Sequence, residues 1–396
     1  MGLFSKIKDK GELVLVFDIG SSSVGGALFL MQSGVSSGIP KILISIRESI
    51  DLEDTFNIDS FLSSTIKSLG IVASGLYKAG MGAPKRIFCV LSSPWYVSQT
   101  RVISFEKNTP FIFTSKFADS LIQKEINLFK EQNVAKYSNT ENSLRLTELK
   151  NIKTMLNGYE ISKPLDQKAK QLEMTIFISM SPESVLKNIE ETVARYFHFK
   201  EIKFSSFAMA SFTAVRDLYI NENNFLLVDV GGEVTDISMV KKNILHGAIS
   251  YPFGSNFIIR AVASALRISL EEAQSQISLL RDGHASHAAT KKLETIFSKL
   301  QGEWLGKFEE SLANISNDIY IPASIYVSAN KELADFFCKT IEAEQLNQYT
   351  LAESKFKVTF LSAEAFHGMA VFDGDAMRDS ALIIDSIYLN RFLNKI

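Results

Sequence analysis

Two segments of the chain repeat one pattern at long spacing, and this repeat limits the fold more than any other feature. LVLVFDIGSSSVGGALFL runs from Leu13 to Leu30, and FLLVDVGGEVTDISMV runs from Phe225 to Val240. Each has an apolar strand, an Asp-x-Gly turn of small and polar residues, and a second apolar strand. Solenoid repeats recur at only about 20–50 residues. The spacing therefore predicts a duplicated α/β domain rather than a solenoid.

Each turn places an aspartate at the end of a buried strand, Asp18 in the first and Asp229 in the second. Such a carboxylate can face a cleft, because burying an unpaired charge in a core is costly. The residues that follow offer backbone N–H groups and hydroxyls to one spot, and they are Gly20, Ser21, Ser22, Gly231 and Gly232. Backbone nests bind phosphate, and carboxylates hold hydrated Mg²⁺. One turn alone is typical of a tight strand connection, whereas the matched pair favours a nucleotide cleft.

The composition is that of a globular protein with a large core. The chain has 396 residues, of which 46% are hydrophobic and 22% are charged, and its net charge is −2. This balance excludes a dominant nucleic-acid-binding surface, which needs clustered positive charge. No apolar run reaches the ~18–20 residues that span a bilayer. The two cysteines, Cys89 and Cys338, lie far apart in apolar surroundings, which is typical of reduced thiols.

The pattern changes between the two repeats, from Lys85 onwards. The strand-like segments RIFCVLSS and YVSQTRVISFE are followed by an amphipathic helix, SKFADSLIQKEINLFKEQ, and by two further strand-like segments. One helix among several strands predicts a small α+β unit over 85–171, packed beside the main sheet. Elsewhere, apolar residues at helical spacing predict helices over about 57–80 and 285–317.

These residues resemble the actin-like ATPase superfamily. DIGSSSVGGALF and DVGGEVTDISMV are similar to its phosphate 1 and phosphate 2 motifs, in the same order and with a unit inserted between them. The inserted unit resembles the SHS2-type subdomain of the bacterial FtsA and PilM proteins, and the segment 251–283 is similar to the FtsA stretch after phosphate 2. The resemblance covers about residues 12–365. It implies an α/β, actin-like (ribonuclease H-like) two-domain fold with an inserted α+β SHS2-like subdomain.

The resemblance also implies a cofactor, ATP with Mg²⁺, and a site for it. Asp18 and Asp229 match the metal-associated acids. The other matching positions are Gly20, Ser21, Ser22, Gly231, Gly232 and Thr235 in the phosphate motifs, and Ser328, Ala329 and Asn330 in the adenosine motif. Glu233 and Ser328–Asn330 depart from the family, which usually has glycine at these places for close backbone approach. We therefore expect ATP binding with at most slow hydrolysis, and we assign no catalytic residue.

The expected domain division follows from the two hairpins and the insert. Residues 1–84 form the first half of domain 1, 85–171 form the SHS2-like insert, and 172–220 complete domain 1 and connect the domains. Residues 221–365 form domain 2, and 366–396 pack back onto the fold. In the connection, the small residues of FAMASFTAV suit either a hinge or close helix packing.

The resemblance implies a scaffold protein. We expect an ATP-binding, FtsA-like cell-division adaptor at the cytoplasmic face of a bacterial membrane, which self-associates into filaments or oligomers and links division proteins to the membrane. A PilM-like scaffold for type IV pilus assembly is one alternative, and a pseudo-ATPase that binds partners without turnover is another. A phosphotransferase or phosphatase of the same fold would need a further catalytic acid in the cleft, and the sequence offers none.

The first ten residues, MGLFSKIKDK, lack the apolar region of a secretory signal. Leu3, Phe4 and Ile7 can share one helical face flanked by lysines, as in segments that lie on an anionic membrane surface. A disordered chain end is the alternative. We therefore predict a cytoplasmic protein, peripheral at the inner face of the cell membrane, with residues 1–10 contacting either lipid or a partner protein.

Overall fold

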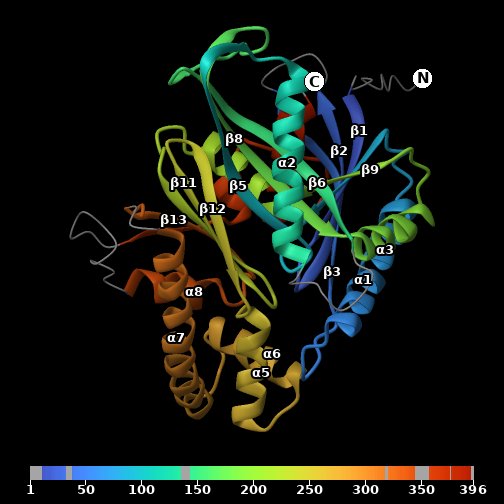
Figure 1. Ribbon diagram of the computed structural model, residues 1–396. Helices are drawn as coiled ribbons and strands as arrows, with labels where there is room; N and C mark the ends of the chain where they lie inside the picture. The colour runs from blue at the N-terminus through green and yellow to red at the C-terminus, as the bar shows by residue number, and fades with distance from the viewer. Residues whose placement is uncertain are drawn as a thin grey trace, which may run out of the picture.

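The computed structural model describes residues 11–32, 38–134, 143–316, 320–343, 356–374 and 376–393 of the chain. The predicted membrane-contact segment, residues 1–10, lies outside the described residues. Within the described part, three β-sheets form the framework and helices cover their faces (Figure 1). None of the helices described there has the length and apolar character needed to cross a bilayer.

The two larger sheets have the same order over five strands, as the sequence repeat predicts, and the first sheet has one further edge strand, β15 (Val371–Phe372). The first contains, in order, β15, β3 (Lys41–Ser49), β2 (Ser23–Gln32), β1 (Gly11–Ile19), β4 (Arg86–Leu91) and β9 (Ile202–Ser206). The second contains β12 (Ile244–Tyr251), β11 (Thr235–Lys241), β10 (Phe225–Val230), β13 (Ser324–Ala329) and β14 (Lys357–Phe360). Strands β1 and β10 each pair antiparallel with their hairpin partner and parallel with β4 or β13. Asp18 and Asp229 therefore occupy equivalent places near the carboxyl ends of these two strands.

The first sheet is covered on both faces. Successive side chains of a strand point to opposite faces, and the fully buried Val14 and Val16 of β1 pack in one core while Leu15 and Phe17 pack in another. Helices α4 (Phe207–Leu218) and α9 (Ser380–Leu393) complete the first core, and α1 (Ile58–Lys78) and α3 (Glu183–Ala194) complete the second. A strand buried on both sides reads as a continuous apolar run, which explains the LVLVF segment.

Helix α1 begins where the sequence predicts, because the side chain of Asn57 caps it. Asn57 Oδ1 accepts hydrogen bonds from the backbone N–H groups of Asp59 and Ser60, at 3.0 and 3.1 Å. Helix α9 is apolar on nearly all sides and packs against α4, β1 and β2. Residues 380–393, within the predicted C-terminal segment, thus lie in the core of the first sheet.

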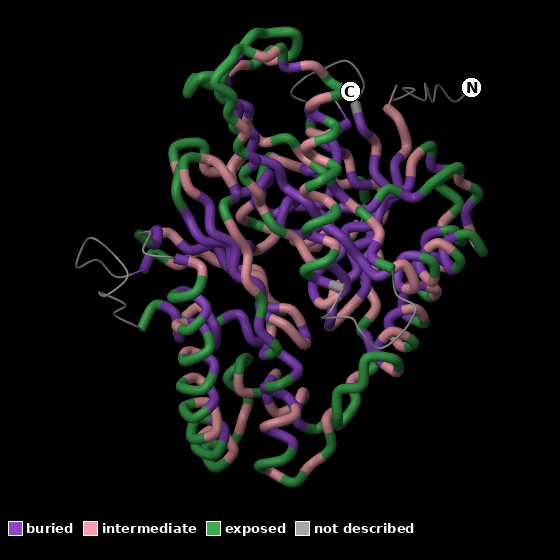
Figure 2. Tube along the Cα trace, viewed as in Figure 1, coloured by how far each residue is buried: buried purple, intermediate pink, exposed green. Residues whose placement is uncertain are grey.

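Four helices pack around the second sheet: α5 (Ser255–Leu266), α6 (Leu270–Arg281), α7 (His287–Ser316) and α8 (Ala334–Ala343). The central residue of their core is Trp304, which is fully buried and stacks on Phe308 with 5.1 Å between ring centroids. Helix α7 matches the helix predicted over 285–317, and exposed residues follow its outer side in Figure 2. Buried tube segments in the same view trace the strands of both large sheets.

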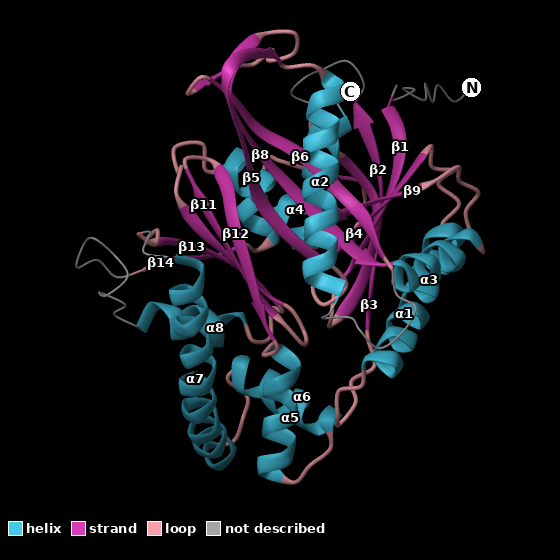
Figure 3. Cartoon of the chain, in the orientation of Figure 1, coloured by secondary structure: helices cyan, strands magenta, loops and turns pink. Residues whose placement is uncertain are grey.

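A third sheet has the order β5 (Val97–Ile112), β8 (Lys168–Pro182), β6 (Leu144–Leu156) and β7 (Tyr159–Glu160), and α2 (Ser115–Val134) packs on it (Figure 3). It corresponds to the predicted α+β insert, but β4 belongs to the first sheet, so the inserted strands begin at Val97 rather than at Lys85. Strand β8 pairs with β5 and β6 beyond the predicted end at 171, so the insert extends to Pro182. Composition marks a segment as a strand without specifying its sheet. The parallel pairing of β4 with β1 is a long-range contact that the local pattern does not contain.

Candidate functional site

The two Asp-x-Gly turns meet in the structure. The backbone N–H groups of Gly232 and Glu233 donate hydrogen bonds to the hydroxyl oxygen of Ser21, over 2.8 and 3.2 Å. The carbonyl groups of Gly231 and Gly232 accept bonds from the N–H groups of Ser255 and Asn256, the first residues of α5, over 2.9 and 2.8 Å. Because the turn is held on one side by α5, its amides point at the first turn.

Close backbone approach requires the glycines of this contact. A Cβ atom on Gly232 would lie 2.3 Å from the carbonyl oxygen of Ser21, and one on Gly254 would lie 2.4 Å from the carbonyl oxygens of Gly231 and Gly232. Both separations are far below van der Waals contact, and the obstacles are backbone atoms that cannot move aside easily. Gly232 is thus needed for the two turns to touch, and Gly254 lets α5 approach the second turn.

Asp18 pairs with an arginine that sequence reasoning did not select. Arg47, on β3, donates from Nη2 to Asp18 Oδ2 over 2.6 Å and from Nη1 to the hydroxyl of Ser23 over 2.8 Å. Its Nε and Nη2 also bind both oxygens of Asp379, just before α9. Burial raises the pKa of Asp18 and the charge of Arg47 opposes this rise. Burial also acts to raise the pKa of Asp379, but Arg47 outweighs it and the pKa is lowered.

Among the described residues, none places such a cation on the aspartate of the second turn. Burial raises the pKa of Asp229 well above its ordinary value, the charges of Asp236 and Asp18 add to the rise, and a hydrogen bond with Ser328 opposes it. Asp236 faces Asp229 across the hairpin and accepts a hydrogen bond from the hydroxyl of Ser93 over 2.9 Å. Burial and the neighbouring carboxyl groups therefore disfavour the charged form of Asp229.

A further carboxyl group lies near these acids, on α9. Asp385 is fully buried, and neither of its oxygens has a hydrogen-bond partner among the described residues. Burial raises its pKa well above the ordinary value, and the charges of Asp18, Asp379 and Asp229 act in the same direction, while Arg47 opposes them. Such surroundings disfavour the charged form of a carboxyl group.

A cavity of about 410 Å³ opens between the two turns. Nine of the eleven predicted site residues line it: Asp18, Gly20, Ser21, Ser22, Asp229, Gly231, Ser328, Ala329 and Asn330. The structure therefore brings the phosphate turns and the predicted adenosine segment to one space. Gly232 and Thr235 do not line it. Thr235 donates its hydroxyl proton to the carbonyl of Phe253 over 2.6 Å and lies 3.4 Å from Nε1 of Trp304, so it holds the second core together.

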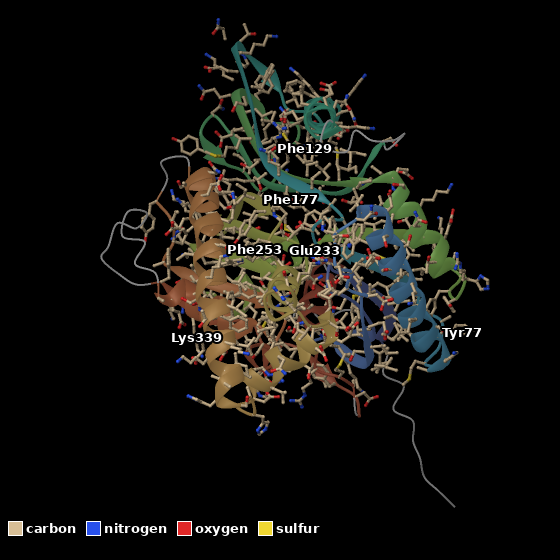
Figure 4. The ribbon with its side chains drawn as sticks, turned by 90° about the horizontal axis from the view of Figure 1, so that it is seen from below. Tyr77, Phe129, Phe177, Glu233, Phe253 and Lys339 are labelled. Carbon is tan, nitrogen blue, oxygen red and sulfur yellow. The ribbon has the colours of Figure 1, made fainter. Side chains whose placement is uncertain are left out.

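Glu233 points away from the cavity. Its carboxylate is bound by both terminal nitrogens of Arg260, each over 2.8 Å, and by the side-chain amide of Asn256 over 2.7 Å. Nε of Arg260 donates in turn to the carbonyl of Glu53, which follows β3 of the first sheet. Figure 4 shows Glu233 among packed side chains, whereas Tyr77 and Lys339 lie at the periphery. Glu233 is thus part of a bridge between the two halves, not an exposed loop carboxylate.

Sequence reasoning missed the charged residues that complete the cavity wall: Arg47, Lys331, Glu364, Arg378 and Asp379. A weak signal existed for Asp379, because it directly precedes an apolar helix and its Oδ1 accepts from the N–H of Leu382 over 2.9 Å. Arg47 gave none, since one charged residue near the end of a strand is typical of a solvent-facing position.

The residues present do not fit a divalent ion held between Asp18 and Asp229. Mg²⁺ is held in proteins by carboxylate oxygens and waters at about 2.0–2.1 Å, but Oδ2 of Asp18 accepts a hydrogen bond from Arg47 and burial raises the pKa of Asp229. Among the described residues, no group of three or more His, Cys, Asp or Glu side chains is placed to hold a metal ion. The predicted metal ligation by Asp18 and Asp229 stays a prediction, and this arrangement does not support it.

Two sheets with the same order over five strands, with one Asp-x-Gly turn from each facing a shared cavity, define the actin-like ATPase fold. Among solved structures, the chain is similar to the PilM-PilN type IV pilus biogenesis complex, with 12% identity over 96% of this chain and 97% of that chain and a TM-score of 0.58. The ethanolamine utilization protein EutJ from Carboxydothermus hydrogenoformans matches 96% of this chain and 89% of its own, with 10% identity and a TM-score of 0.40. No protein family and no curated protein matches the sequence. The expected actin-like α/β fold is confirmed, and the SHS2 resemblance of the insert stays a prediction.

Proposed function

We propose that the chain is an actin-like scaffold that binds ATP between its two turns and holds partner proteins at the cytoplasmic face of a bacterial membrane. The shared cavity is the observation that carries this proposal. Its volume of about 410 Å³ lies within the range of about 300–1,000 Å³ for small-molecule sites. The pilus-assembly form of such a scaffold is supported by the likeness to PilM over nearly the whole of both chains.

The cavity wall suits a nucleotide. The hydroxyls of Ser21 and Ser22 and the charges of Lys331 and Arg378 would hold the phosphates, since these groups favour anionic oxygens. Residues 328–330 would lie beside the nucleoside, as the resemblance implies. We propose no hydrolytic step. Glu233 is bound to Arg260, and no contact identifies any of the described acids at the cavity as a catalytic base.

Calorimetry with ATP tests this function. The wild-type chain is expected to bind ATP, and Ser22→Asp, which adds a negative charge to the cavity wall, is expected to weaken binding by at least about tenfold. Ser298→Asp makes the same change at an exposed position of α7 and should leave the affinity unchanged. Absence of ATP binding by the folded wild-type chain, or equal affinity in both variants, would refute the nucleotide assignment.

The insert supports the scaffold part of the proposal. It carries seven large apolar side chains that are exposed: Val102, Ile112, Leu128, Leu146, Leu149, Tyr159 and Leu165. A cavity of about 540 Å³ also lies between it and the second sheet, lined by Val97, Phe129 and, from β12, Ile249. Exposed apolar groups of this kind mark protein–protein contacts. We propose that this surface contacts a partner protein or a second copy of the chain.

The FtsA-like division adaptor is the second candidate, and the sequence of the α5–α6 region favours it. Deleting the gene in its host separates the two processes. Loss of surface pili with normal cell length supports the pilus scaffold, whereas filamentous cells with normal pili support the division adaptor. Normal pili together with normal cell length would contradict both assignments.

A further inference from the structure

A positive charge, that of Arg47 on β3, lies beside the aspartate of the first turn, whereas no described residue places one beside the aspartate of the second turn. The guanidinium of Arg47 makes four hydrogen bonds to described residues: one to Asp18, two to Asp379 and one to Ser23. A guanidinium has five N–H donors in a planar fork, so four of them are used in fixed directions. The charge is therefore held in one place at the wall of the cavity, between β1, β2 and the start of α9.

The neighbouring strand makes room for this charge. Gly25 faces both Asp18 and Arg47 in the register of the first sheet, and a Cβ atom on it would lie 2.6 Å from Nη2 of Arg47. At the equivalent place of the second hairpin, the residue facing Asp229 is Asp236. The two turns share their backbone course, but only the first accommodates a guanidinium beside its aspartate.

We propose that Arg47 occupies the cation position of this cleft in place of a divalent metal ion, so that the chain binds ATP without metal. The proposal deepens, and rests on, the proposed nucleotide function. Arg47 already binds Oδ2 of Asp18 over 2.6 Å, and a divalent ion at the other oxygen would lie beside this positive charge and be repelled by it. Arginine provides a permanent positive charge that can balance phosphate as well as carboxylate. Two further cations on the same wall, Lys331 and Arg378, add to the balance.

The first experiment measures ATP affinity by calorimetry in EDTA and in millimolar Mg²⁺, with the full chain. The wild-type affinity is expected to agree within about threefold between the two buffers. Arg47→Met removes the charge, and its ATP affinity in EDTA is expected to be at least about tenfold lower than that of the wild type. Mg²⁺ is expected to restore part of this affinity. Arg47→Lys is the matched control, since it keeps the charge and should retain binding in EDTA. An affinity of the wild-type chain that rises at least about tenfold with Mg²⁺ would overturn the proposal.

The second experiment needs no nucleotide. Mn²⁺ is titrated into the wild-type chain alone, and the free ion is followed by electron paramagnetic resonance. No binding at micromolar Mn²⁺ is expected, because Arg47 holds the position; stoichiometric binding abolished by Asp18→Asn would overturn the proposal. If the wild-type chain binds ATP in neither buffer, the nucleotide function is refuted, and the Mn²⁺ titration still decides whether Arg47 excludes a metal ion.

Discussion

Replacing Asp385 by asparagine should change how the stability of the chain depends on pH. The Asp385 carboxyl is fully buried without a hydrogen-bond partner among the described residues, and burial raises its pKa well above the ordinary value of 3.8. In the unfolded chain this group releases its proton above about pH 4, whereas in the folded chain it keeps it. Below about pH 4 this group therefore does not reduce the unfolding free energy, and above it the unfolding free energy falls as the pH rises.

The decrease in unfolding free energy can be calculated for each pH unit. Each pH unit between the unfolded and folded pKa values lowers the unfolding free energy by about 1.4 kcal/mol. Asparagine has nearly the same shape and no proton to release, so Asp385→Asn removes this slope. With about 2.1 cal/mol/K of unfolding entropy per residue, a chain of 396 residues unfolding as one unit has about 0.8 kcal/mol/K. The melting temperature of the variant relative to wild type should therefore rise by about 2 °C per pH unit between pH 5 and 6.

Scanning calorimetry at pH 5.0, 5.5 and 6.0 would measure this difference at the pH values where the slope is expected. The other buried acids titrate in both proteins and largely cancel, and a fixed offset from the buried amide does not alter the slope. Asp119→Asn, at an exposed position of α2, is the control for loss of one charge and should give a flat difference. A flat difference for Asp385→Asn as well would mean that this carboxyl ionises freely in the folded chain, and the reasoning would be wrong.

Three further predictions concern other parts of the molecule. Tyr388→Phe removes the hydroxyl that donates to the buried carboxylate of Glu148 and should cost about 1–3 kcal/mol, measured as a lower melting temperature. Glu233→Gly leaves Arg260 without its bidentate partner, so stability should fall by about 3–5 kcal/mol while ATP affinity does not increase. Removing residues 1–10 should leave the circular dichroism spectrum unchanged and lower co-sedimentation with anionic vesicles.

A specific result would contradict each of these three predictions. Tyr77→Phe, on the exposed side of α1, is the control for the first, and an equal change in both variants would argue against the bond to Glu148. Tighter ATP binding by Glu233→Gly would mean that the carboxylate faces the phosphates in solution. Equal sedimentation of the truncated and full-length chains would leave residues 1–10 as a protein-docking segment or a disordered end.

Sequence reasoning located the two hairpins, because the two strands and the turn of each hairpin lie within about sixteen neighbouring residues. The cap of α1 at Asn57 was predictable for the same reason. The partner of Asp18 was not, because Arg47 lies on another strand and its second partner, Asp379, is 332 positions further along the chain. The partner of Glu233 was not predictable either, because nothing local shows that Arg260, in the next helix, reaches back to it. The partners of charged residues in the cleft depend on which strands and helices pack together, and a single sequence does not contain this information.

Because α9 is buried against the first sheet, that sheet can be completed only after the end of the chain has been synthesised. Its residues fill the core between β1 and α4, and the pair Arg47–Asp379 joins positions 332 residues apart. A ribosome adds about 5–20 residues per second, so roughly 20–70 s pass between the emergence of the two partners. During that time the part of β1 and β2 that α9 covers lacks this helix. The first half of the cleft is therefore completed only when the end of the chain has been synthesised.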